Sequence, residues 1–199
     1  MLKQGMVVTL LSVSTVCGQS ENSPTAFAYQ SPIVEKVIFD DSVMLAQERH
    51  NYATNLAAYA ANLVSVEKAS KESLESARRI LALALHLERR NKQAVVINFQ
   101  LREGVIPEIK KGDYNPRTFA RLLMTRAKLL LKSNNDNESE RLLARCFIEL
   151  AAHIDPRNED AVFEYENQRI DSGDLDWRVL TDAVRDKPSR VSGVEDPEG

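Results

Sequence analysis

The chain contains an internal repeat, in which residues 77–95 match residues 144–162 at a spacing of 67 residues. Nine of these nineteen positions are identical. In the first copy the identical residues are Ala77, Arg78, Leu83, Ala84, His86, Arg90, Asn91, Ala94 and Val95. A long internal repeat is typical of structural units that pack against one another, so one repeated unit accounts for most of the chain.

The residue pattern within each copy predicts three helices. Tyr52, Leu56, Ala60 and Leu63 recur at spacings of three or four residues, as one helix face requires. The first copy is expected to have helices at 51–66, 70–88 and 92–103, and the second at 117–132, 138–154 and 159–172. A closing helix is expected at 176–185.

The placement of glycine and proline excludes a fold with many tight turns. Neither residue occurs between Pro32 and Gly104, whereas leucine and alanine, both strong helix formers, are abundant. The sequence therefore predicts an all-α fold, with antiparallel helix pairs stacked as a short α-solenoid. It would consist of two copies of the three-helix unit and the closing helix.

The expected organisation along the chain has six parts. These are a signal peptide at 1–18, a flexible tether at 19–32, a capping segment at 33–50, a first repeat copy at 51–112, a second repeat copy with the closing helix at 113–186, and a disordered tail at 187–199. The capping segment is compatible with either a short helix or a strand.

Small residues mark the positions where paired helices would meet. Ala60 and Ala127 lie in the first helices, and Ala77 and Ala144 open the second helices, before an exit at Ile154-Asp155-Pro156. This pattern resembles the tetratricopeptide-repeat family. The resemblance implies a helical-repeat scaffold or adaptor whose concave surface binds an extended peptide or a partner helix.

The amino-terminal segment is typical of a secretory signal. Lys3 precedes the apolar residues 7–16, and Gly18 and Gln19 flank the expected cleavage position. An exported protein, periplasmic or extracellular, is therefore expected, and ten apolar residues are too short for a stable membrane span. Two alternatives stay open: a cytoplasmic adaptor whose first residues are structural, and a lipoprotein acylated at Cys17.

Charge and motifs favour a binding protein over an enzyme. With 26 basic and 29 acidic residues and no dense basic run, nucleic acid is not an expected partner. No motif for phosphate binding, metal binding or nucleophilic catalysis is present, so no catalytic residue, metal or cofactor is expected. Cys146, His86 and His153 are expected to have structural roles. A cell-envelope hydrolase or regulator on a helical scaffold is the alternative from another class.

A candidate partner-binding groove lies on the first helix of the second copy. Arg121, Lys128 and Lys132 share one helix face, with Met124 and Leu131 beside them. These residues are expected to bind a protein or peptide with an acidic segment or a terminal carboxylate. The alternative is an ordinary solvated helix face. The first-copy equivalents are small and uncharged, which predicts an apolar second end of the groove: Thr54, Ala57, Ala61, Val64 and Ser65.

Overall fold

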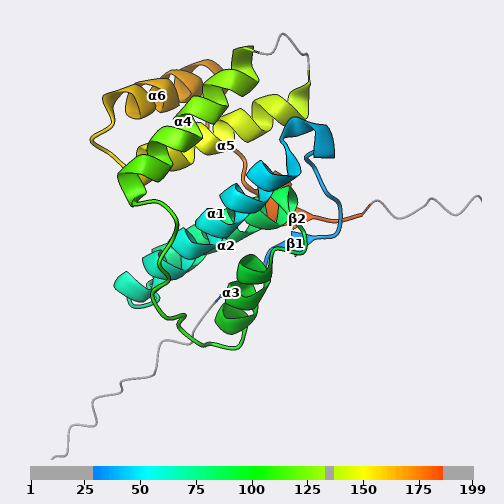
Figure 1. Cartoon of the computed structure of the whole chain (residues 1–199), viewed down its shortest axis with the longest axis vertical. Helices are drawn as coiled ribbons and strands as arrows, with labels where there is room; N and C mark the ends of the chain where they lie inside the picture. The colour runs from blue at the N-terminus through cyan, green and yellow to red at the C-terminus, as the bar shows by residue number, and fades with distance from the viewer. Residues whose placement is uncertain (1–28, 133–136, 186–199) are drawn as a thin grey trace, which may run out of the picture.

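The computed structural model describes residues 29–132 and 137–185, and within them the all-α prediction is confirmed (Figure 1). The helices are α1 (Ala46–Val66), α2 (Lys71–Leu87), α3 (Lys92–Arg102), α4 (Pro116–Lys132), α5 (Glu138–Ile154), α6 (Glu159–Ser172) and α7 (Arg178–Thr181). A short 3-10 helix, η1 (Asp41–Val43), and two short strands, β1 (Ile33–Val34) and β2 (Asp182–Ala183), complete the described elements.

The helix boundaries recur at the spacing of the sequence repeat. Both bounds of α5 lie 67 residues after those of α2, and α6 begins 67 residues after α3. The side chains of Asn91 and Asn158 accept hydrogen bonds from the backbone N–H groups of Ala94 and Ala161, which caps α3 and α6 at their first turns. Gly173, with a φ of 72°, ends α6.

Small side chains bring the paired helices together. Ala53, Ala60 and Ala77 are fully buried where α1 packs along α2, and Ala127 and Ala144 are fully buried where α4 packs along α5. Side chains this small permit a close approach of helix axes. The third helices differ, because α3 packs against both α1 and α2, whereas α6 packs chiefly against α5.

The two helix pairs meet through aromatic side chains. The Tyr52 ring of α1 stacks on the Phe147 ring of α5, with centroids 5.3 Å apart, and the Tyr52 hydroxyl donates a hydrogen bond of 3.2 Å to the Leu122 carbonyl. Arg126 of α4 donates a 2.6 Å bond to the Val43 carbonyl. Figure 1 shows α4, α5 and α6 together at one end, the α1–α2 pair in the middle and α3 beyond it.

The segment before the first copy was predicted with the wrong boundary. The helix expected to begin at residue 51 begins at Ala46, because the Glu48 side chain accepts a bond from the Leu45 backbone N–H and so caps an earlier turn. Both forms considered for the capping segment are present: the strand is β1 and the short helix is η1.

The closing helix is also shorter than predicted. Residues 176–185 contain only the single turn α7, and β2 follows it and pairs in parallel with β1. The reason is a set of contacts with α2: the Leu180 carbonyl bonds to the His86 ring nitrogen at 2.9 Å, and Asp182 pairs with Arg78 at 2.7 Å. These contacts hold residues 180–182 against α2, so α7 ends after a single turn.

Several predicted segments lie outside the described residues. They are the signal peptide 1–18 with its cleavage position at Gly18 and Gln19, most of the tether, Cys17, and the tail 187–199. Among the helices of residues 29–132 and 137–185, none is both long and apolar enough to cross a membrane.

Burial of His86 predicts a loss of stability in mild acid. The side chain is 2% exposed, and burial lowers its pKa. The unfolded chain, with an ordinary histidine pKa of about 6.5, then binds more protons than the folded chain below that pH. The free energy of unfolding should therefore fall as the pH drops from about 7 to 5.5, by at most about 1.4 kcal/mol per pH unit.

Urea denaturation of the wild type and of His86→Gln at several pH values tests this prediction. The glutamine amide retains a donor for the Leu180 carbonyl but does not titrate. His153→Gln is the matched control, because His153 occupies the equivalent position of α5 and is exposed. An unchanged pH slope in His86→Gln would refute the assignment to His86.

Candidate functional site

A basic hollow of about 640 Å³ opens between α4 and the connection from α5 to α6. Arg117, Arg121 and Lys128 of α4 line one side of it, and Asp155, Arg157 and Asp160 line the other. The arginine and lysine side chains are all exposed. The lining thus holds four cations and two carboxylates, which leaves an excess of positive charge in a concave, solvent-accessible site.

The structure places three of the five predicted groove residues in the basic hollow. They are Arg121, Met124 and Lys128, and Met124 is 5% exposed. Leu131 and Lys132, at the carboxyl end of α4, are exposed but lie outside its lining. The hollow is therefore closer to the start of α4 than the sequence predicted.

Sequence reasoning missed Arg117 and Arg157. Arg117 precedes Arg121 by four residues on the same helix face, a spacing that the sequence did display. Arg157 comes from the α5–α6 connection, and no periodicity within α4 could have placed it there.

One carboxylate in the basic hollow neutralises part of its charge. Asp160 Oδ2 lies 3.5 Å from Lys128 Nζ, and both side chains are largely solvent-accessible. Exposed ion pairs of this kind contribute only about 0–1 kcal/mol, so an anionic ligand could compete with Asp160 for Lys128.

The predicted apolar end of the groove is wrong. Ala57, Ala61 and Val64 are fully buried. The connection between α3 and α4 runs back along this part of α1. Asn62 accepts a 2.6 Å bond from the Lys110 backbone N–H, and Ser65 donates a bond to the Pro107 carbonyl. Helix α3 and this connection both pack on α1, so the part of α1 that the sequence left open is covered.

The first copy nevertheless has a hollow at the place equivalent to the basic hollow. It measures about 430 Å³, and His50, Thr54, Asn91 and Gln93 are among the residues that line it. These residues stand 67 positions before Arg117, Arg121, Asn158 and Asp160 of the basic hollow. The repeat thus places a concavity at the same point in both copies, with different side chains.

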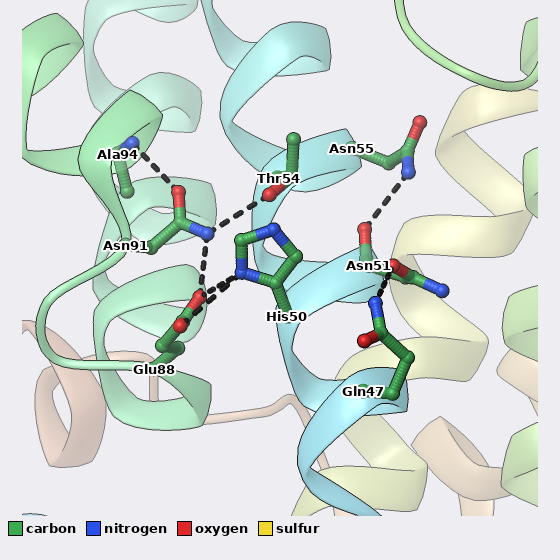
Figure 2. A network of polar contacts seen from close by, with 8 residues as sticks. All are labelled: Gln47, His50, Asn51, Thr54, Asn55, Glu88, Asn91 and Ala94. Carbon is green, nitrogen blue, oxygen red and sulfur yellow. Dashed lines mark hydrogen bonds and ion pairs between the residues drawn. The ribbon is translucent and has the colours of Figure 1, made fainter.

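Polar side chains of the first-copy hollow bond to one another (Figure 2). Asn91 donates to Thr54 Oγ1 at 2.9 Å and to Glu88 Oε2 at 2.7 Å, while the His50 ring lies 2.9 Å from the same carboxylate oxygen. Figure 2 also shows the cap from the Asn91 side chain to Ala94 at the start of α3. These groups are largely satisfied within the chain, whereas the basic hollow presents its cations to solvent.

Within the part of the chain that the structure describes, no group of three or more His, Cys, Asp or Glu side chains could hold a metal ion. Cys146 is fully buried in α5, and burial raises the pKa of its thiol well above the usual range, which keeps it protonated and unreactive.

In comparisons with protein-family models, curated proteins and solved structures, no match to this chain was found.

Proposed function

We propose that the protein is a non-enzymatic adaptor or scaffold, and that it binds an acidic segment or a terminal carboxylate of a partner protein in the basic hollow. The observation that carries this proposal is the convergence of Arg117, Arg121, Lys128 and Arg157 on one concavity. The helix pairs would form a short, tetratricopeptide-like α-solenoid, for which the buried small residues at the pair contacts are the support.

The geometry of the basic hollow suits a carboxylate ligand. Arg117 and Arg121 project from consecutive turns of one helix, so a carboxylate could bridge two guanidinium groups, each able to donate paired hydrogen bonds. Met124 lies within the lining and offers an apolar contact for a side chain next to the acidic group. The site therefore favours a peptide that combines acidic and apolar residues.

Reversal of one charge tests the proposal. In Arg121→Glu, the affinity for a fluorescent ten-residue peptide rich in aspartate and glutamate should fall at least about tenfold, because an attractive charge-assisted bond becomes a repulsion. Fluorescence polarisation at two salt concentrations measures this. The effect should shrink at high salt, as expected for exposed charges.

Two further variants give that experiment its controls. Lys71→Glu makes the same change in net charge at an exposed position of α2, outside the basic hollow, and should leave binding unchanged. Asp160→Asn removes the carboxylate that pairs with Lys128 and should raise the affinity about two- to fivefold. Equal losses in Arg121→Glu and Lys71→Glu would refute specific binding in the hollow.

We further propose that the protein is exported. The support is the order of Lys3, the apolar residues 7–16 and the small Gly18. Amino-terminal sequencing of the protein from its native cells should then give Gln19 as the first residue. A chain that begins at Met1 would instead favour the cytoplasmic adaptor.

A further inference from the structure

A second hollow, separate from the basic hollow, lies where the two helix pairs and the closing segment meet. It measures about 330 Å³. Its polar and aromatic lining includes Tyr59 of α1, Glu67 directly after α1, Arg79 of α2, Glu149 and His153 of α5, and Trp177 before α7. We call it the junction hollow. None of its residues takes part in the proposed peptide site.

Glu149 is the unusual residue of the junction hollow. Its side chain is 8% exposed and accepts a 2.7 Å hydrogen bond from the indole nitrogen of Trp177. No cation within residues 29–132 and 137–185 pairs with it. Arg145, one helical turn before Glu149, instead donates to the Gly173 carbonyl at 2.7 Å.

A buried carboxylate with one neutral donor and no counter-ion is costly to the folded state. Arg79, which also lines the hollow, pairs with Glu75 at 3.3 Å and forms no ion pair with Glu149. A ligand cation would compensate the Glu149 charge. The buried carboxylate therefore indicates that the hollow accepts a positively charged group.

The rest of the lining fits the same ligand chemistry. Tyr59 and Trp177 are aromatic, and aromatic rings attract ammonium groups through their negative faces. Leu63, Ile80 and Leu150 add apolar surface for a hydrocarbon stem. The exposed carboxylate of Glu67 brings a second negative charge to the lining, while His153 is the remaining titratable group there.

We propose that the junction hollow binds an alkylammonium group, with its charged head against Glu149 and its hydrocarbon stem against the apolar lining. The group is either the side chain of a lysine in a partner protein or a free diamine, because both present the same head and stem. Binding contacts α1, α2, α5 and the segment before α7 together, so it ties the two helix pairs to one another.

Trp177 provides a direct measurement, because it is the only tryptophan in the chain and lies in the junction hollow. Titration of the full chain with n-butylammonium chloride should change its fluorescence along a saturable curve. 1-Butanol, which has a similar stem and no charge, should bind at least tenfold more weakly. Equal responses to the amine and the alcohol would overturn the proposal.

Glu149→Gln separates charge from structure. The amide oxygen of glutamine can still accept the Trp177 hydrogen bond at nearly the same volume, so only the charge is lost. Butylammonium affinity should fall at least tenfold in this variant. Glu166→Gln, the same charge change at an exposed ion pair of α6, should leave it unchanged. Unchanged affinity in Glu149→Gln would overturn the proposal.

A second variant and a second readout protect the test against misfolding of Glu149→Gln. Glu67 is exposed, so Glu67→Gln should fold normally and weaken binding about two- to threefold, measured by isothermal titration calorimetry.

The two sources of the amine, a free diamine and a lysine side chain, are compared by the same calorimetric titration. Tighter binding of 1,5-diaminopentane than of Nα-acetyl-lysine N-methylamide indicates a free diamine, and the reverse order indicates a lysine side chain. Absence of saturable binding by all three amines overturns the proposal.

Discussion

Replacing Phe147 with alanine is expected to lower the free energy of unfolding by about 4 kcal/mol. Phe147 is fully buried in α5 and stacks on Tyr52 of α1, with an interplanar angle of 17°. The substitution therefore removes a large apolar side chain from the core and breaks the ring contact that joins the two helix pairs. Urea denaturation followed by far-ultraviolet circular dichroism measures the loss.

Phe163→Ala is the matched control for this change. Phe163 lies on α6 with 64% of its surface exposed, so the same substitution should cost less than about 0.5 kcal/mol. A double-mutant cycle of Phe147→Ala with Tyr52→Leu should give a coupling of about 1 kcal/mol for the ring pair. Similar losses in Phe147→Ala and Phe163→Ala would contradict the packing of α5 against α1.

The helix boundaries that could be predicted are those encoded by local chemistry. Ser70, Asn91 and Asn158 each cap the helix that follows with their own side chains, and Gly173 supplies the positive φ that ends α6. Such signals involve residues within a few positions of one another. They can be recognised in the sequence without knowledge of the tertiary structure.

The features that could not be predicted depend on contacts between distant residues. The connection that covers α1 is held by Asn62 and Lys110, which are 48 positions apart. The closing segment is diverted from a helix by bonds from Leu180 and Asp182 to α2, which are 94 and 104 positions apart from their partners. Hydrophobic periodicity describes one element at a time and does not report which elements meet.

The candidate site contains residues that could be predicted from local spacing and a residue that could not. Arg121 and Lys128 could be placed on one face of a helix because their spacing is periodic. Arg157 reaches the same hollow from the α5–α6 connection. Its place in the hollow depends on contacts between elements, which the periodicity of α4 does not report.

Equivalent positions of the repeat have acquired different surroundings. His86 and His153 correspond in α2 and α5, but the closing segment covers α2, so His86 is buried against Leu180 while His153 is exposed. Equivalent positions in the repeat therefore do not give the two histidines the same contacts. Paired substitutions at such positions measure what the surroundings contribute, because the residue and its place in the helix stay constant.

The asparagine caps provide the sharpest comparison of this kind. Asn91→Ala is expected to lower the free energy of unfolding by about 3 kcal/mol, and Asn158→Ala by about 1 kcal/mol. Both lose the cap of the third helix in their copy. Asn91, which is 1% exposed, also loses its bonds to Thr54 and Glu88 and leaves those groups without that donor (Figure 2).

The measurement is urea denaturation of both variants beside the wild type. Asn158 is half-buried, so water can replace its bond to the Ala161 N–H, and only the ordinary cost of a lost cap should be seen. Thr54→Val, made in the wild type and in Asn91→Ala, adds a check. The substitution should lower the free energy of unfolding less in Asn91→Ala, because the Asn91 amide that donates to Thr54 is already absent there. Equal losses in Asn91→Ala and Asn158→Ala would mean that the network around His50 and Glu88 adds no stability beyond the cap. The asparagine would then contribute the same free energy to folding in both copies, although its neighbours differ.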